Sequence, residues 1–293
     1  MTAPGSSTGV SADRKPRDDE IDVFGLTHRG KVRTINEDHF LISSLHKKVQ
    51  VHMTSLPDSQ AFAGDTSRLA FMAMVADGVG GGPHGDDASR WAVEAITQYV
   101  THSLHCYYTS DSTDHEAFSR GLEEAALHCH AELQQRADED PAFEGMASTL
   151  TLWLGVWPRA YLLQVGDSRA YLLREGRLTQ LSSDQTMAQV LIEQGILTRA
   201  DAIGTRWEHV LSSSIGGPES LPVVTRVDQQ WGDVGLLCSD GLTKHVPDER
   251  IRERLMAMPS AKAGCEALLQ DALDGGGTDN ITIVIGRTNK REG

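Results

Sequence analysis

The feature that most constrains the fold is the grouping of strand-like segments between pairs of amphipathic helices. Short turns join the strands within a group, and such strands run antiparallel. The strand-like segments cover 21–27, 39–43, 69–76, a group within 148–181 with turns at 157–159 and 175–176, then 223–228, 234–238 and 281–285. The sequence therefore predicts antiparallel sheets.

Four longer helices are predicted, and they come in two pairs. In the first pair, apolar residues recur at helical spacing; they are Ala88, Trp91, Ala95, Tyr99 and Leu104, and then Phe118, Leu122, Ala125, Cys129 and Leu133. The second pair is expected at 248–258 and 260–273. A helix with one apolar stripe lies across a sheet, so we predict an α+β fold: a four-layer α/β/β/α sandwich of two antiparallel sheets flanked by helix pairs.

The chain is predicted to contain one folded domain. Residues 1–19 are rich in Ser, Gly, Pro and charged residues, which is typical of a disordered tail. The domain is expected to cover 20–288, and no internal repeat or second domain is visible.

Composition narrows the classes of function. The formal net charge is -14, from 27 Lys+Arg against 41 Asp+Glu, and this excludes a nucleic-acid partner, whose affinity comes from basic surface. The longest apolar runs are far shorter than the roughly 20 residues that cross a bilayer, and the N-terminus lacks the apolar core of a signal peptide. We therefore expect a soluble, cytoplasmic protein with no membrane partner. The four scattered cysteines contain no CxxC pair and suit reduced thiols.

Three aspartates occupy matching local settings. Asp77 and Asp240 each end an apolar strand and precede a glycine, and Asp279 follows a glycine run and opens the last strand. An aspartate at one strand end is often only a turn former. Three in the same setting favour a shared site, where the glycines let backbone and ligand approach closely.

A fourth polar cluster, Arg33-Thr-Ile-Asn36-Glu37-Asp38, lies between the first two predicted strands. Taken alone it reads as a salt-bridged loop, although arginine is also the side chain best shaped to grip a phosphate. Converging carboxylates supply hard oxygen ligands, which favour magnesium or manganese over zinc. Two such ions about 3.5–4 Å apart, bridged by water, would lower the pKa of that water. The substrate expected beside two cations and an arginine is a phosphate ester.

Six segments, taken in order, resemble the motifs of the type 2C metal-dependent serine/threonine protein phosphatases, in their bacterial branch. They are RTINED from Arg33, VADGVGG from Val75, GMASTL from Gly145, VGDSRAYL from Val165, CSDGL from Cys238 and GGTDNITIVI from Gly276. The resemblance runs from about residue 21 to 286. It implies that the domain is a phosphatase catalytic domain, which hydrolyses phosphoserine and phosphothreonine in proteins by a metal-bound hydroxide that attacks phosphorus directly.

The resemblance also implies roles for single residues. Asp77 would bridge two Mn²⁺ or Mg²⁺ ions, with Glu37 and the carbonyl of Gly78 on the second ion. Asp240 and Asp279 would bind the first ion, and Arg33 would bind the phosphate. Asp38 would orient metal-bound water, and Asp167 would have a structural role in its turn. The partners implied are phosphoprotein substrates in signal transduction, together with a serine/threonine kinase and its targets.

The sequence departs from the family pattern at two positions. The aspartate that holds a third ion in many members is Glu144 here; glutamate is also an oxygen ligand, so a third ion shared with Asp240 stays open. The histidine proposed as general acid in eukaryotic members is Val79 here, so His84 or a water molecule would have to protonate the leaving-group oxygen. The polar segment 184–217 matches the family's flap, and we expect it to contact the substrate protein.

Two other classes of function compete with this interpretation. A cysteine phosphatase needs a Cys, five intervening residues and then an Arg, and at the Arg position the sequence has Ser112 after Cys106 and Gln135 after Cys129. A catalytically weak or inactive binding module of the same fold is the remaining alternative. The presence of Glu37 together with all three aspartates argues against it.

Overall fold

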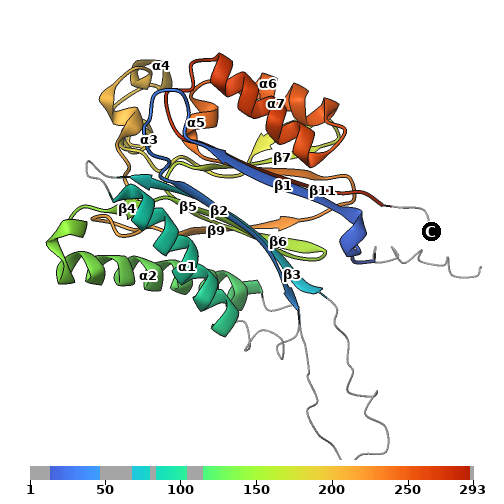
Figure 1. The fold of residues 1–293 in the computed structure, drawn as a ribbon, viewed down its shortest axis with the longest axis horizontal. Helices are drawn as coiled ribbons and strands as arrows, with labels where there is room; N and C mark the ends of the chain where they lie inside the picture. The colour runs from blue at the N-terminus through green and yellow to red at the C-terminus, as the bar shows by residue number, and fades with distance from the viewer. Residues whose placement is uncertain (1–13, 47–67, 80–83, 104–114, 291–293) are drawn as a thin grey trace, which may run out of the picture.

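The computed structural model describes residues 14–46, 68–79, 84–103 and 115–290. Two antiparallel sheets lie face to face, with helices on both outer faces (Figure 1). The predicted α/β/β/α sandwich is therefore confirmed. The predicted polar stretch 47–67, the end of the first helix at Leu104 and residues 1–13 of the expected tail lie outside the described ranges.

The first sheet has five strands in the order β1-β11-β10-β7-β8. Their bounds are β1 Ile21–His28, β11 Ile281–Thr288, β10 Val234–Cys238, β7 Arg169–Arg174 and β8 Arg177–Gln180. The second sheet has the order β2-β3-β5-β6-β9, and the short β4 pairs with β3. Its bounds are β2 Asp38–His46, β3 Arg68–Val79, β4 Ala147–Ser148, β5 Leu150–Val156, β6 Arg159–Val165 and β9 Val223–Asp228.

The helices form the two outer layers. The long helices α1 (Gly85–Ser103) and α2 (His115–Glu139) cover the second sheet, whereas α6 (Asp248–Ala257) and α7 (Ala261–Asp274) cover the first (Figure 1). The shorter helical segments are η1 Asp18–Glu20, η4 Pro141–Phe143, α3 Met187–Glu193, α4 Arg199–Ala202, η5 Arg206–His209 and α5 Asp240–Thr243. Among the described residues, no helix is long and apolar enough to cross a membrane.

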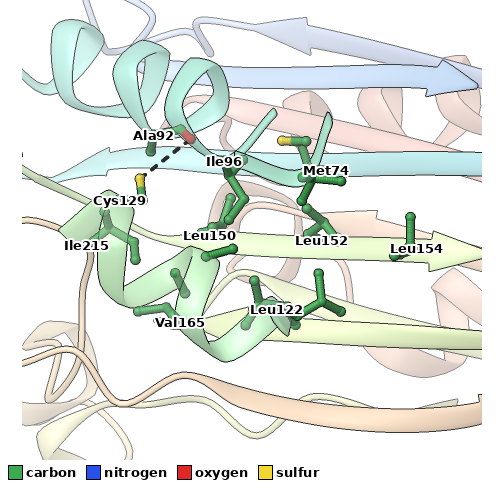
Figure 2. Packing of buried hydrophobic residues seen from close by; sticks show 14 of the residues in the cluster. Met74, Ala92, Ile96, Leu122, Cys129, Leu150, Leu152, Leu154, Val165 and Ile215 are labelled. Carbon is green, nitrogen blue, oxygen red and sulfur yellow. Dashed lines mark hydrogen bonds between the residues drawn. The ribbon is translucent and has the colours of Figure 1, made fainter. Parts of the chain in front are cut away.

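Alternation along the strands divides the apolar core into layers. In β5, Leu150, Leu152 and Leu154 point toward α1 and α2, and Figure 2 shows them packed with Ile96 and Leu122. Side chains on the opposite faces of the strands fill the space between the sheets; among them are Ala73, Val75, Leu162, Leu237 and Val284. A separate cluster lies between the first sheet and α6 and α7.

Four connections cross from one sheet to the other, and their positions decide where polar loops gather. The longest, 181–222, links β8 to β9 and contains α3, α4 and η5. The segment 29–37 links β1 to β2, and 166–168 links β6 to β7; both cross at the edge where β3 and β10 end. The segment 229–233 links β9 to β10 at the opposite edge. The first edge therefore holds the loop of Arg33 and the turn of Asp167.

The predicted elements agree with the observed ones to within a few residues, and 223–228 and 234–238 coincide with β9 and β10. The group predicted within 148–181 does not stay in one sheet: β5 and β6 belong to the second sheet, and β7 and β8 to the first. In the segment expected as a tail, Arg14 forms an ion pair with the buried Glu20, and Asp18 pairs with Arg68 of β3.

Candidate active site

Three aspartates from both sheets meet at one edge of the sandwich. Asp77 lies near the end of β3 in the second sheet. Asp240 begins α5, two residues after β10 ends, and Asp279 lies two residues before β11 begins; both strands belong to the first sheet. Burial raises the pKa of Asp77 well above its ordinary range, and the negative charges of Asp38, Asp240, Asp167 and Asp279 raise it further. The three predicted residues are therefore brought together, and their charges oppose one another.

Asp38 joins the two sheets beneath this cluster. It starts β2, opposite Asp77 in register, and it is buried. Its Oδ2 accepts hydrogen bonds from Ser239 Oγ and Thr282 Oγ1 of the first sheet, both at 2.7 Å. Its Oδ1 is buried without a hydrogen-bond partner in the described part of the chain. Burial raises the pKa of Asp38 to about 7, although the two hydroxyl groups lower it.

Two cations offset part of the negative charge. Lys244 Nζ lies 2.6 Å from Asp240 Oδ2 and 2.7 Å from Asp279 Oδ2. Arg33 Nε lies 2.8 Å from Asp279 Oδ1. Burial would raise the pKa of Asp279, but the hydrogen bonds and charges of Lys244 and Arg33 outweigh it and lower that pKa. In Asp240 the effect of burial is larger than that of Lys244, so the pKa of Asp240 is raised.

Glu37 is held against the start of α1 by two glycines. A Cβ on Gly78 would collide with the carbonyl group of Gly85, and a Cβ on Gly85 would lie 2.6 Å from Glu37 Oε1. The amide of Gly78 also donates to the carbonyl oxygen of Glu37 at 3.0 Å. Glycine at both positions is thus what lets the carboxylate of Glu37 reach this edge.

Asn280 fixes the loop that carries Arg33 and Glu37. Its Oδ1 accepts from the amide of Glu37 at 2.8 Å, and its Nδ2 donates to the carbonyl groups of Arg29 and Ile35. Neither Asn280 nor Lys244 was predicted from the sequence to have a role. The available signal was their position, because each lies next to or within one turn of a predicted ligand, Asp279 or Asp240.

Asp167 belongs to the acidic cluster as well as to the turn that carries it. Its pKa is raised to about 7, first by burial and then by the charges of Asp240 and Asp184. The neighbouring Ser168 Oγ hydrogen-bonds Thr149 Oγ1 at 2.8 Å, and Thr149 Oγ1 accepts from the amide of Asp77 at 3.0 Å. The turn thus supports Asp77 and adds a carboxylate to the edge.

Two further candidates form no hydrogen bond or ion pair with the cluster in the described ranges. Glu144 ends the short η4 segment and is exposed; its side chain forms no ion pair or hydrogen bond with the described residues. His84 Nδ1 lies 3.2 Å from Asp87 Oδ2, and its ring packs edge-on against Phe143. The cysteines Cys129, Cys238 and Cys265 are buried free thiols, and burial raises the pKa of each to about 12.

The donor set fits a hard divalent cation. Every candidate ligand atom is a carboxylate or carbonyl oxygen, as Mg²⁺ and Mn²⁺ prefer. Asp38 Oδ1 and Asp240 Oδ1 are buried acceptors without a partner in the described ranges, and a buried unpaired oxygen is costly unless a ligand satisfies it. Within those ranges, no three acidic, imidazole or thiol groups already converge on one ion position, and Lys244 and Arg33 hold Asp279 instead.

Known proteins are similar to this chain in both sequence and fold. The protein phosphatase 2C family model matches residues 51–274. PstP of Mycobacterium tuberculosis, a serine/threonine protein phosphatase, is 33% identical over 216 residues, which are 74% of this chain and 40% of PstP. The serine/threonine phosphatase stp of Listeria innocua is 29% identical over 74% of this chain and 84% of its own length.

A solved structure supports the same relation. The catalytic domain of PstP in complex with two manganese ions superposes with a TM-score of 0.69 and 29% sequence identity, covering 92% of this chain and 99% of that domain. The sandwich with aspartates at one edge therefore places this chain in the structural class that the PstP domain represents. The chain belongs to the protein phosphatase 2C family.

Proposed function

We propose that this protein removes phosphate from phosphoserine and phosphothreonine residues of other proteins. The observation that carries the proposal is the convergence of Asp77, Asp240 and Asp279 from two sheets beside Arg33, in a member of a phosphatase family. Folding gains nothing from gathering like charges in partly buried positions, since burial raises their pKa values. Such perturbed groups mark functional sites.

The proposed cofactor is a pair of Mn²⁺ or Mg²⁺ ions. The residues that would hold them are Glu37, Asp77, Gly78 through its carbonyl, Asp240 and Asp279. When bound, such ions lower the pKa of water and offset the charge that builds on a phosphoryl group. The two manganese ions of the PstP domain support this stoichiometry. A third ion, held by Asp240 and Glu144, is a separate proposal that a metal titration would count.

The chain's own groups have distinct parts in the reaction. Arg33 has a half-exposed side chain and makes its short contacts to Asp279, so part of its guanidinium still faces solvent. We assign it to the phosphate oxygens, which its planar donors match. We assign Asp38 to orient the attacking water by accepting a hydrogen bond from it; its Oδ1, buried and without a protein partner in the described ranges, supports this role. Direct attack of water on phosphorus, without a phosphoenzyme, needs no nucleophilic side chain.

The segment 184–217 is proposed to recognise the substrate protein. Its base is closed by hydrogen bonds between Met187 and Val210 and between Ser212 and Gln185. Beyond this base, Ile196 and Ile203 have exposed fractions of 63% and 74%. Exposed apolar side chains on a polar segment next to the acidic edge suit contact with a protein.

Replacing Ile196 and Ile203 together by serine should raise KM for a phosphothreonine peptide about threefold to tenfold, because the variant buries less apolar surface when the peptide binds. Hydrolysis of a small aryl phosphate should not change, because that substrate does not reach the flap. Met256→Ser, at an exposed position on α6, is the matched control. An equal loss on both substrates would contradict a recognition role.

The cellular setting is also proposed. Buried free thiols suit a reducing compartment, so we place the protein in the cytoplasm, in a signalling pathway where it opposes a serine/threonine kinase. Cell fractionation followed by immunoblotting tests the location. Phosphoproteome comparison of cells with and without the protein tests the substrates.

The decisive assay is hydrolysis of a phosphothreonine peptide by metal-stripped protein, titrated with Mn²⁺ and then treated with excess chelator. Activity that appears with Mn²⁺ and disappears with chelator supports the proposal. A folded protein that binds Mn²⁺ but cleaves no peptide and no aryl phosphate would instead be a binding module.

A further inference from the structure

A cavity of about 110 Å³ lies between the two sheets, at the edge opposite the acidic cluster. The strands that border it are those that lead to the aspartates. In β3, Phe71 and Ala73 line the cavity and Asp77 lies beyond them; in β10, Gly235 and Leu237 line it and Asp240 follows. The two sites therefore share strands but no residue.

Three glycines leave this space open. Gly235 and Gly286 pair directly across β10 and β11, and Gly155 faces them from β5 of the other sheet. Their φ angles lie outside the left-handed region. A Cβ would lie 3.9 Å from its nearest neighbour at Gly235, 3.7 Å at Gly286 and 3.4 Å at Gly155. Neither backbone strain nor crowding requires glycine here.

Glycine in a strand interior costs stability, because it loses more freedom on folding and offers no side chain to pack. A row of glycines that faces an apolar cavity therefore destabilises the fold without serving the backbone. A bound molecule that fills the volume beside the missing side chains would account for them.

The lining indicates the chemistry of that molecule. Phe71, Trp153 and Trp157 present aromatic rings, and Leu237 and Val284 present aliphatic groups. The side-chain amide of Gln229 lies over Gly155, with Oε1 3.5 Å from the Cβ position there. It offers a hydrogen-bond acceptor and donor to an otherwise apolar ligand.

The charged groups at the mouth already have partners. Lys15 Nζ donates to the carbonyl oxygens of Arg68 and Leu69. Arg68 pairs with Asp18, Arg287 Nε lies 2.9 Å from Asp22 Oδ2, and Asp233 Oδ2 lies 2.7 Å from Arg174. A charged ligand would have to break one of these pairs or lose its hydration, and both are costly. The site therefore favours a neutral ligand.

We propose that this inter-sheet cavity binds a small neutral aromatic molecule of one or two rings. An apolar engineered cavity of about 150 Å³ holds benzene, so the smaller volume here encloses at most one ring, and a second ring would extend through the opening toward solvent. The inference does not rest on the proposed phosphatase activity, because no metal ligand or phosphate-binding residue lines the cavity.

The test uses the full chain with indole as the probe, measured by isothermal titration calorimetry and by the shift in melting temperature. Indole should bind at a single site and raise the melting temperature, and Mn²⁺ should leave its affinity unchanged. Indole-3-acetate, which carries a negative charge, should bind about tenfold more weakly or worse. Equal binding of the two would overturn the assignment of a neutral ligand.

Gly235→Val should abolish indole binding by placing a β-branched side chain in the cavity, and Gly286→Ala is the milder variant should Gly235→Val not fold. Ser43→Val is the matched control: it adds an apolar group in β2, where Ser43 Oγ is buried and unpaired in the described ranges. Its strand partner Met72 faces the helices, away from the cavity. Absence of binding to the wild type, or equal binding to all variants, would overturn the proposal.

Discussion

The same strands run from one edge of the sandwich to the other, and the two edges lose stability for different physical reasons. At one edge, β3, β10 and β11 crowd carboxylates together, and the cost is electrostatic. At the other edge β10 and β11 each carry a glycine, Gly235 and Gly286, and the cost is looser packing. Both edges give up stability, and both do so where the sheets face each other. The apolar clusters between the two edges supply the stability that both edges give up.

Asp240→Asn should have the largest effect, because it removes one charge from the acidic edge with little change in volume. Activity on a phosphothreonine peptide should fall at least about 100-fold, as loss of a metal-holding group weakens both ion binding and charge compensation. Steady-state kinetics at saturating Mn²⁺ measures this, and far-UV circular dichroism checks the fold. Normal turnover would contradict the assignment of this edge as the active site.

The acidic edge should make the metal-free protein less stable as pH rises. The pKa of Asp38 is raised from its ordinary 3.8 to about 7, so between these pH values the folded state holds a proton that the unfolded state has released. Stability therefore falls with rising pH through this window. With chelator, urea unfolding should show roughly 1–3 kcal/mol less stability at pH 8 than at pH 5.

Asp38→Asn is the variant that sharpens this prediction, since it keeps an acceptor for Ser239 and Thr282 but cannot titrate. It should flatten much of the pH dependence. The hydrogen bond from Arg254 lowers the pKa of Asp271 to about 2. Asp271 therefore titrates below this window and does not contribute to the change in stability between pH 5 and pH 8. A metal-free protein that becomes more stable from pH 5 to pH 8 would show that ionisation of these carboxylates does not destabilise the folded state.

Lys244 should compete with cations at the acidic edge. Its ammonium group bridges Asp240 and Asp279, so Lys244→Gln should tighten Mn²⁺ binding about tenfold by removing a like charge. Calorimetric titration of metal-stripped protein measures the change. Lys262→Gln, on an exposed face of α7, should leave affinity unaltered; weaker binding in Lys244→Gln would mean that the lysine assists the ion.

A pair of glycine variants compares the two edges directly. Gly286→Ala should raise the free energy of unfolding by about 0.5–1 kcal/mol, because its Cβ has room and the strand loses less entropy. Gly78→Ala at the acidic edge should destabilise the fold, since its Cβ would meet the backbone of Gly85. Chemical unfolding measures the change in the free energy of unfolding of each variant. Similar changes in the two variants would contradict the proposed difference between the edges.

Local pattern was enough to predict most elements. Apolar periodicity placed α1 and α2, and the runs at β9 and β10 were predicted to the residue. The aspartates at 77, 240 and 279 were identifiable because each lies within two residues of both a strand end and a glycine. Lys244 was missed because a lysine after a short helical turn has many uses, and only the folded arrangement shows that it reaches Asp279, 35 residues away.

The sequence by itself determined the alternation of strands and helices, the net charge, and the set of oxygen donors, because these depend on residue type and near-neighbour spacing. The tertiary structure decided which sheet each strand joins and where the chain crosses between sheets. Those crossings bring Asp38 beneath Ser239 and Thr282, and leave the glycines of β5, β10 and β11 facing one another. Contacts between residues hundreds of positions apart depend on packing of whole layers, which no local pattern encodes.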